Sequence, residues 1–460
     1  MANMDGFYLK ETMDLLGFDQ NKIAEEFACE KDTIVNYCSF PEKPLQVEHA
    51  KKLELLRENF INKKNLHSIL LDLKQQIKES PNSFSPNKIF AHPDKLVDII
   101  KSYQNNDNGF SIFPFLVEIH LTNNCSHKCP NCTFSSLHKR SDAKNAEFDK
   151  EHIKSILDEL EELGIKAIFW SGGGDPLCYP FAEEIFEYAA KKNFKQLLIT
   201  NGAHLDKIDN NILIKYFSTV RISLDSHISK TFSKIHGFTE DEGAMEFSNI
   251  TNNIKKLVKT FTNTSETERN PDINKIGIGV SFLLTLDNVN EIIGFYNLAK
   301  NELGVQYAEM KPLVYDKNNK NNEIIKKLLV DSQLVEMLRL LKQEKEKDKK
   351  FRFFTLEHKF IDMLSDDYGR TFKKCWGHSL YPTIAADGGV YPCCLMVERN
   401  MYLYGNLKNN SFKNIWKSNE RKSTDILVTN CPINCKLSET NKVLQTILDT
   451  QKLELREYIN

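Results

Sequence analysis

Residues 113–312 alternate between short apolar runs and amphipathic stretches, and this alternation predicts the core of the fold. The apolar runs predict buried strands, and the stretches between them have helical periodicity. Strict alternation of strand and helix predicts parallel strands joined by right-handed crossovers. Six such units are too few for a closed eight-stranded barrel, so we expect an α/β fold with an open, partial (β/α)6 barrel. The predicted strands are Phe115–Leu121, Ala167–Ser171, Gln196–Thr200, Thr219–Leu224, Gly277–Leu284 and Gln306–Met310.

The segments on either side of this core have different patterns. Residues 1–60 predict a helical module, residues 61–112 a helical linker, and residues 313–370 a helical connector. Residues 371–460 contain cysteine, glycine and proline at short intervals, which predicts a small α+β domain, and they end in a predicted helix from about Ser438. Within this part, Gly388-Gly389 predicts the tight turn of a hairpin.

Charge and hydropathy exclude several classes of function. The chain has 460 residues, with 61 Lys and Arg against 63 Asp and Glu, for a net charge of -2. This balance argues against wholesale electrostatic binding to nucleic acid or anionic lipid. No apolar run approaches the roughly 18 residues that span a bilayer, and the first residues are acidic where a secretion signal would be basic. We therefore expect a cytoplasmic protein with no membrane contact.

Seven of the eleven cysteines fall into two groups, and the first group follows directly after the first predicted strand. Clustered cysteines in a reducing compartment bind metal or take part in chemistry more often than they form disulfides. Cys125, Cys129 and Cys132 lie within eight residues, so their thiolates can bind three of the four irons of a cubane cluster and leave the fourth open. A zinc site with His127 or His138 as fourth ligand is the alternative.

The cysteine loop and three later strand ends together resemble the radical S-adenosylmethionine (SAM) superfamily. The resemblance rests on Leu121–Cys132, on the segment Phe169–Pro176 with its three glycines, and on the ends of the next two strands. It implies that Cys125, Cys129 and Cys132 bind a [4Fe–4S] cluster whose open iron coordinates SAM. It also implies that the strand ends bind SAM itself, through Gly172, Gly173, Gly174, Asp175, Thr200, Asn201, Ser223 and Asp225.

The second cysteine group resembles the auxiliary-cluster region called SPASM, in its shortened "twitch" form. Cys375, Cys393, Cys431 and Cys435 supply four thiolates, enough for one further [4Fe–4S] cluster, with a structural zinc as the alternative. Cys394 could replace Cys393 as a ligand. The resemblance therefore implies two [4Fe–4S] clusters and SAM as cofactors.

The resemblance further implies an oxidoreductase that cleaves SAM reductively to a 5′-deoxyadenosyl radical, which abstracts hydrogen from a polar substrate. We expect oxidation or epimerisation of a sugar-like or cyclitol-like metabolite, with flavodoxin or ferredoxin as electron donor. One alternative is a peptide maturase that forms cross-links or thioethers. Glu309 and Lys311 share one face of the last predicted strand, and we consider them candidates for proton acceptor or substrate contact.

Residues 20–37 resemble a repressor-type helix-turn-helix, and a third interpretation is therefore an iron–sulfur-sensing transcription regulator. DNA binding needs cations that neutralise phosphates. Residues 1–60 contain 7 Lys and Arg against 12 Asp and Glu, for a net charge of -5. The charge argues against DNA as a partner and favours a protein-docking or structural module.

Overall fold

One curved, mostly parallel sheet is the centre of the molecule. The computed structural model describes residues 4–77, 92–107, 109–141, 143–314, 322–364, 372–397, 399–424, 431 and 435–450. Among them, ten strands form one sheet in the order β10-β9-β8-β1-β2-β3-β4-β5-β6-β7, with β10 and β7 at its two edges. The strands are β1 (Leu116–His120), β2 (Ala167–Ser171), β3 (Lys195–Thr200), β4 (Phe217–Ser223), β5 (Gly277–Leu284), β6 (Tyr307–Pro312), β7 (Arg352–Phe354), β8 (Thr383–Ile384), β9 (Gly389–Tyr391) and β10 (Gly405–Asn406).

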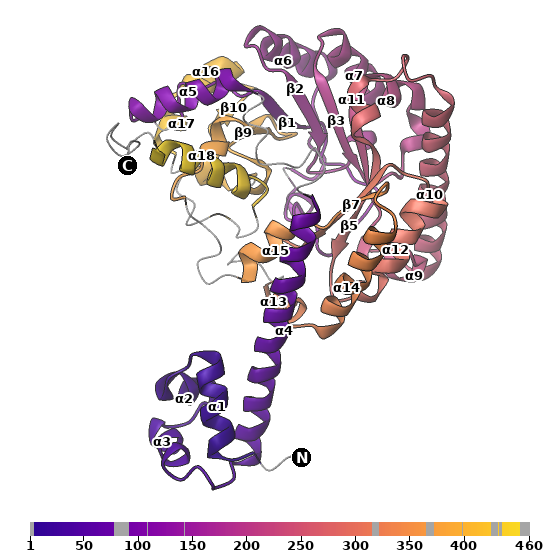
Figure 1. Ribbon diagram of the computed structural model, residues 1–460. Helices are drawn as coiled ribbons and strands as arrows, with labels where there is room; N and C mark the ends of the chain where they lie inside the picture. The colour runs from indigo at the N-terminus through magenta and orange to yellow at the C-terminus, as the bar shows by residue number, and fades with distance from the viewer. Residues whose placement is uncertain are drawn as a thin grey trace, which may run out of the picture.

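The predicted open α/β architecture is confirmed. Strands β1 to β6 are parallel neighbours in chain order, and the sheet does not close on itself. The helices that connect these strands cover one face of the sheet (Figure 1).

The helices of the described chain, in sequence order, are α1 (Gly6–Leu16), α2 (Gln20–Phe27), α3 (Lys31–Ser39), α4 (Val47–Ile77), α5 (Pro93–Gln104), α6 (Lys150–Glu162), α7 (Ala182–Lys191), α8 (Asn210–Tyr216), α9 (Ser229–His236), α10 (Glu240–Asn263), α11 (Pro271–Lys275), α12 (Ile292–Asn297), α13 (Asn322–Leu328), α14 (Ser332–Lys347), α15 (Glu357–Leu364), α16 (Phe412–Lys417), α17 (Asn419–Ser423) and α18 (Ser438–Thr450).

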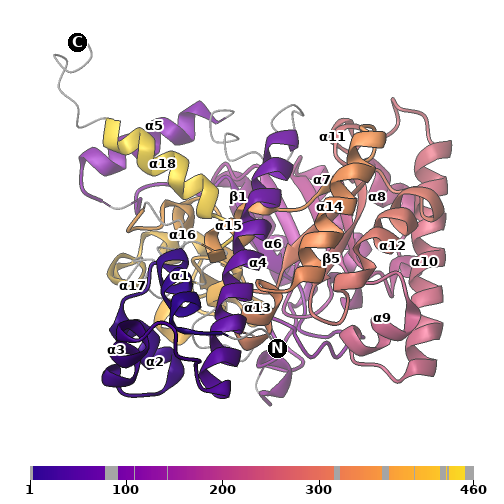
Figure 2. The same cartoon turned by 60° about the horizontal axis from the view of Figure 1, so that its bottom comes forward.

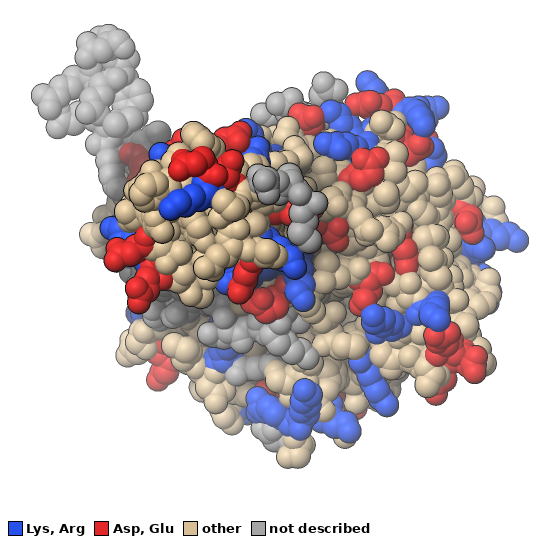
Figure 3. Space-filling view, turned by 90° about the horizontal axis from the view of Figure 1, so that it is seen from below, with Lys and Arg blue, Asp and Glu red and all other residues tan. Residues whose placement is uncertain are grey.

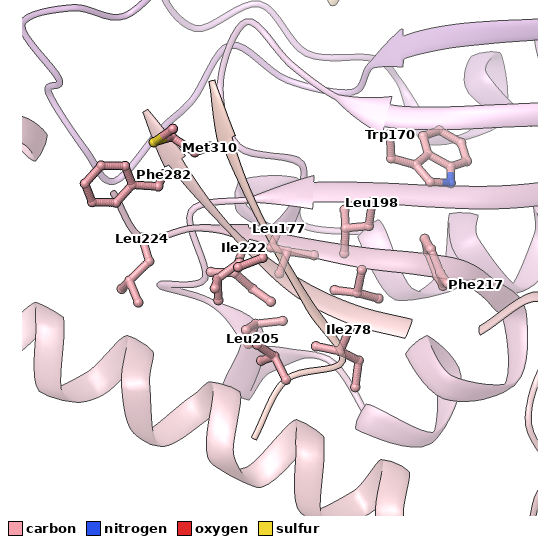
Figure 4. Packing of buried hydrophobic residues seen from close by; sticks show 14 of the residues in the cluster. Trp170, Leu177, Leu198, Leu205, Phe217, Ile222, Leu224, Ile278, Phe282 and Met310 are labelled. Atoms are coloured by element: carbon pink, nitrogen blue, oxygen red, sulfur yellow. The ribbon is translucent and has the colours of Figure 1, made fainter. Parts of the chain in front are cut away.

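The two faces of the sheet differ in polarity, and this difference positions the candidate site. Side chains such as Trp170, Ile222 and Met310 point toward the helices and form the main hydrophobic core (Figure 4). Residues that alternate with them along the same strands, such as Glu118, Arg221 and Glu309, point to the opposite, concave face. The period of two therefore separates an apolar outer layer from a polar inner surface.

The sheet extends at both edges beyond the six predicted strands. Strand β7 adds in parallel to β6, and β8 adds in parallel to β1. The predicted hairpin is present as the antiparallel pair β8–β9, with a turn at Gly388, whose φ is +89°. The first hairpin of the cysteine-rich part thus continues the barrel sheet, while the domain boundaries given above stay predictions.

The N-terminal helices α1, α2 and α3 pack around their own small core, which contains Leu9, Ile23, Phe27 and Ile34. Ala28 ends α2 in the left-handed conformation, at the turn where the motif usually has glycine. The 31-residue helix α4, about 46 Å long, begins beside these helices and reaches the main body. There it packs against α14 and α15 (Figures 1 and 2).

A buried arginine joins the C-terminal helices to the segment that precedes β1. Arg421 is fully buried and donates hydrogen bonds to the carbonyl oxygens of Phe110 and Trp416, at 2.7 and 2.9 Å. Its guanidinium carbon lies 3.7 Å from the centroid of the Trp416 ring. Because these acceptors are buried with it, the side chain connects segments that are more than 300 residues apart in the sequence.

Replacing Arg421 by alanine should lower the free energy of unfolding by about 3 kcal/mol or more, since it leaves buried carbonyl groups without donors and opens a cavity. The neighbouring Lys422 is exposed, so Lys422→Ala is the matched control and should change the free energy by about 0.5 kcal/mol or less. Urea denaturation followed by circular dichroism measures both values. Equal effects of the two variants would show that Arg421 is not a structural connection.

Candidate active site

The loop after β1 carries the first cysteine group and is held by backbone hydrogen bonds to the segment before α6. The amide of Asn123 donates to the Ala146 carbonyl at 2.8 Å, and the amide of Phe148 donates to the Leu121 carbonyl at 3.1 Å. Cys125, Cys129 and Cys132 are all half-buried on this loop. The structure therefore brings the three predicted ligands into one loop at the carboxyl end of β1.

The three thiols are close enough to affect one another. Burial, followed by the charge of Asp175, raises the pKa of Cys125 to about 12. Burial raises the pKa of Cys129 well above its ordinary value, and Cys132 and Cys125 raise it further. Metal ions bind cysteine as the thiolate. Because these thiols have raised pKa values, they ionise together only when a cation balances their negative charges. This donor set fits an iron–sulfur cluster.

His236, from α9, packs against this loop beside His127, which lies on the loop itself. The Nδ1 atom of His236 lies 3.4 Å from the sulfur of Cys129 and 3.2 Å from Nδ1 of His127. The three residues form a possible metal group, but Cys129 is the only cysteine in it. His138 is not part of this group, and zinc at the three cysteines stays the alternative prediction.

The glycine segment after β2 lies directly against the cysteine loop. The amide of Gly174 donates to the Thr122 carbonyl at 3.0 Å, and the amide of Asp175 donates to the Asn124 carbonyl at 2.8 Å. A Cβ atom on Gly174 would lie 2.0 Å from the Asn124 carbonyl oxygen, and one on Gly173 would lie 2.1 Å from the Asn123 side chain. Only glycine permits this approach. Gly172 begins the segment, and a Cβ there would meet the Gly174 carbonyl oxygen at 2.7 Å.

Asp175 connects the glycine segment to the end of β3. Its carboxylate accepts hydrogen bonds from the Thr200 hydroxyl at 2.9 Å and from the amide of Asn201 at 2.6 Å. The Asn201 side chain donates to the Ser126 hydroxyl at 3.1 Å and lies 3.6 Å from the sulfur of Cys125. The structure thus brings three predicted SAM-binding residues together beside the cysteine loop, while their contact with SAM stays a prediction.

The end of β4 supplies the next two predicted residues. Asp225 has a φ of +61° and accepts a hydrogen bond from the amide of Leu283 at 2.7 Å. Burial raises the pKa of Asp225 to about 6, and the positive charge of Lys311 opposes this rise. Ser223 points toward Ser281 on β5, with 3.5 Å between the hydroxyl oxygens. Both residues lie on the side of the sheet where the cysteine loop lies.

Glu309 and Lys311 lie on the concave face of β6, together with a cation that the sequence analysis did not single out. The Arg221 guanidinium lies 2.6 Å from the Glu309 carboxylate, whereas the Lys311 ammonium lies 3.8 Å from it. Burial alone would raise the pKa of Glu309, but Arg221 and then Lys311 lower it. Burial, followed by the charge of Lys311, lowers the pKa of Lys359 on α15 to about 8. Glu309 is therefore an ion-pair partner inside a group of cations.

The second cysteine group lies across the concave face. Burial, followed by the charge of Cys435, raises the pKa of Cys375 to about 11. Burial also raises the pKa of Cys393, and both Cys435 and Cys375 add to this effect. Cys431 and Cys393 pack against the same hydrophobic cluster. Cys375, Cys393 and Cys435 thus lie close enough for their charges to interact, and Cys431 packs in the same hydrophobic cluster as Cys393.

A second buried ion pair joins this region to β1. Lys436 makes a close ion pair with Glu118, and the Glu118 carboxylate also accepts a hydrogen bond from the Ser171 hydroxyl at 2.5 Å. The Lys436 ammonium lies 4.2 Å from the centroid of the Tyr381 ring. Burial, followed by the charge of Glu118, raises the pKa of Cys394 to about 12. The sequence analysis did not single out Glu118, although an acidic residue inside the otherwise apolar run of β1 is a signal for a polar inner surface.

Replacing Gly174 by alanine should prevent the cysteine loop from closing, because the added methyl group would overlap the Asn124 carbonyl. We expect the reconstituted variant to lose about four irons per chain, the content of one cluster, and to lose SAM binding. Iron counting and equilibrium dialysis measure these quantities. Gly164 has a φ of +78° and open space around it, so Gly164→Ala is the control for backbone strain alone. Full iron content in both variants would contradict this prediction.

Cys393 and Cys394 should respond differently to substitution. The charges that act on Cys393 are those of Cys394, Cys435 and Cys375, whereas the largest charges that act on Cys394 are those of Glu118 and Lys436. Cys393→Ser should therefore remove the second cluster, about four irons per chain, and Cys394→Ser should retain it. Iron counting with Mössbauer spectroscopy distinguishes the two results. Loss of iron from Cys394→Ser alone would reverse the ligand assignment.

Comparison with known proteins bears on both cysteine groups. Residues 119–265 match the model of the radical SAM superfamily, and residues 375–436 match the model of the iron-sulfur cluster-binding domain SPASM. The chain is 24% identical over 173 residues to the S-adenosylmethionine-dependent nucleotide dehydratase of Selenomonas ruminantium, a match that covers 36% of this chain and 61% of that protein. It is 25% identical over 297 residues to the PqqA peptide cyclase of Gluconobacter oxydans, which covers 63% of this chain and 74% of that protein.

Two further matches are to a second nucleotide dehydratase and to a solved structure. The chain spans only 44% of the length of a second nucleotide dehydratase, that of Flammeovirga pacifica, at 29% identity and over 28% of its own length. The crystal structure of Streptococcus suis SuiB superposes with a TM-score of 0.49 at 16% identity, over 69% of each chain. The two family matches coincide with the two cysteine groups described above. The chain therefore contains a radical SAM domain followed by a SPASM domain, and these domains imply SAM and two iron–sulfur clusters as its cofactors.

Proposed function

We propose that the chain is a radical SAM oxidoreductase that acts on a substrate bound between the concave face of the sheet and the second cysteine group. Cys125, Cys129 and Cys132 would hold the SAM-binding cluster, and the four cysteines Cys375, Cys393, Cys431 and Cys435 would hold the auxiliary one. When bound, these cofactors supply reductive cleavage of SAM, a radical that abstracts hydrogen, and an acceptor for the electron left on the product.

The observation that carries this proposal is the continuity of polar residues between the two cysteine groups. Lys311 lies within electrostatic range of Asp225 on one side and of Cys394 on the other. Lys359 lies within range of Lys311 and of Cys435. The inner surface therefore reaches from the predicted SAM-binding residues to the predicted auxiliary ligands. A substrate placed there would lie beside both cofactors.

Residues of the chain itself would bind SAM and the substrate in this scheme. The glycine segment and Asn201 would orient the amino acid part of SAM, and Ser223 and Asp225 would bind its ribose and methionine. Glu309 and Lys311 are proposed to accept a proton from the substrate or to bind it. Paired charges on the concave face keep this surface polar, so that a polar substrate can replace water there.

A small polar metabolite, such as a sugar or cyclitol, is one proposed substrate. A specific observation favours a peptide as the second candidate: the match that extends over 63% of this chain is to a protein named as a peptide cyclase. The nucleotide dehydratase match extends over 36% of this chain. Flavodoxin or ferredoxin as electron donor, and a cytoplasmic location, stay predictions. Among the described residues, no helix is both long enough and apolar enough to span a bilayer.

A transcription regulator is the least favoured of the three interpretations. The view from below shows acidic and basic side chains interspersed on the face of the molecule that includes the N-terminal helices (Figure 3). The net charge of -5 over residues 1–60 would repel phosphates. The helix-turn-helix resemblance of α2 and α3 therefore does not lead us to propose DNA binding.

Anaerobic reconstitution tests the proposed function directly. We expect roughly eight irons per chain and release of 5′-deoxyadenosine under strong reductant. Serine at Cys125, Cys129 and Cys132 should abolish this release. Serine at Cys375 and Cys435 should retain the release and block substrate turnover, because it removes only the auxiliary cluster. Cys29→Ser is the matched control, because Cys29 is half-buried like the ligand cysteines but lies in the N-terminal core.

Tightly bound zinc in place of iron, or no consumption of SAM by the iron-loaded protein, would contradict the proposed function. Iron counting, electron paramagnetic resonance and chromatography of the nucleoside products provide these measurements on the same sample.

A further inference from the structure

The concave face carries more positive than negative charge beside the predicted SAM-binding residues. Arg221, Lys311 and Lys359 lie within electrostatic range of one another, and Glu309 is the anion at their centre. Asp225 lies at the edge of this group, within range of Lys311. We define these three cations and Glu309 as the cation group.

The cations are not equally neutralised. Arg221 is paired with Glu309 at 2.6 Å, and this pair is electrically neutral. Lys311 lies 3.8 Å from the other Glu309 oxygen, which is the outer limit of an ion pair. In the part of the chain that the structure describes, no carboxylate lies within ion-pair distance of Lys359. Two ammonium groups thus have weak or no direct compensation.

These side chains also retain accessible surface. Lys311 is 26% exposed and Arg221 is 16% exposed, whereas Glu309 is 1% exposed. The two cations therefore keep part of their side chains accessible to solvent, whereas the Glu309 carboxylate is buried. Ammonium groups in such an arrangement bind oxyanions through charge-assisted hydrogen bonds.

We propose that Lys311 and Lys359 bind an oxyanion of the substrate, a carboxylate or a phosphate, and hold it between the two cofactor sites. Glu309 positions Arg221 and orients Lys311 without itself contacting the anion. This inference rests on the proposed function and adds the charge class of its substrate. It applies to an acidic side chain of a peptide and to an acidic small metabolite, because both present the same group.

A competing explanation is that the cations only balance the charge of the clusters, since Lys359 lies within electrostatic range of Cys435. The two explanations differ in one measurable property. A binding subsite takes up a free anion when both clusters and SAM are present, whereas a set of balancing charges does not.

The experiment uses the full chain, reconstituted with both clusters and SAM, in equilibrium dialysis at constant ionic strength. The probes are radiolabelled inorganic phosphate and radiolabelled succinate. Lys359→Met and Lys311→Met are the test variants, and Lys359→Arg keeps the charge. Lys255 is exposed on α10, so Lys255→Met is the matched control for the loss of one charge.

We expect saturable binding of at least one probe to the unchanged protein, to Lys359→Arg and to Lys255→Met. Lys359→Met should weaken this binding about tenfold or more, since one charge-assisted hydrogen bond is lost. Circular dichroism and iron counting on each variant separate loss of the subsite from loss of folding. Competition by acetyl-Ala-Glu-Ala-amide, and none by its glutamine counterpart, would assign the subsite to acidic peptides, and preference for phosphate would assign it to a phosphorylated metabolite.

No saturable binding, or equal binding by Lys359→Met and Lys255→Met, would overturn the inference. Release of 5′-deoxyadenosine by the unchanged protein is measured in parallel. Release without anion binding would overturn the subsite alone, whereas absence of release would overturn the proposed function whatever the dialysis shows.

Discussion

Charged side chains on the inner face of the parallel sheet need partners, and the rest of the structure depends on this requirement. A buried charge without a partner costs several kcal/mol, so each such residue must be paired or must face open space. Glu118 on β1 meets this requirement through Lys436, which lies 318 residues later in the chain. The requirement therefore brings the cysteine-rich segment back to the first strand. The parallel addition of β8 to β1 reinforces the same return with main-chain hydrogen bonds.

The second constraint is the close contact of two loops at the carboxyl ends of β1 and β2. The glycine segment can approach the cysteine loop only because it has no side chains there, and Asp175 then ties it to β3. Residues from three neighbouring strands are thereby fixed with respect to Cys125. Loops at the carboxyl ends of parallel strands meet at one edge of the sheet, which is why these residues come together.

The sequence predicted the regular parts of the fold well and the pairings across the sheet poorly. The predicted bounds of β2 and β5 agree with the structure, because turn residues mark both ends of these apolar runs. The amphipathic stretch between β5 and β6, which predicts one helix, instead forms three pieces, since a 3-10 turn precedes α12 and a π turn follows it. Strand β7 has only three residues, too few to show a period of two.

Within the site, the sequence indicated residues that follow strands, because parallel strands fix where their ends lie. It did not indicate Lys359, which lies on an amphipathic helix like many other lysines. Nor could it pair Arg221 with Glu309, since these residues are neighbours only after β4, β5 and β6 align in register. Long-range pairing of this kind is set by tertiary structure, and no local pattern records it.

Lys359 lies on a helix that contacts both the sheet and the long helix leading from the N-terminal helices. It lies on α15, which packs against both β6 and α4. The same α4 forms part of the core of the N-terminal helices through Leu53. One continuous helix thus contacts the N-terminal core near its start and the helix that carries Lys359 near its end. The N-terminal helices are therefore connected through α4 both to α15, which carries Lys359, and to α14 in the outer helical layer.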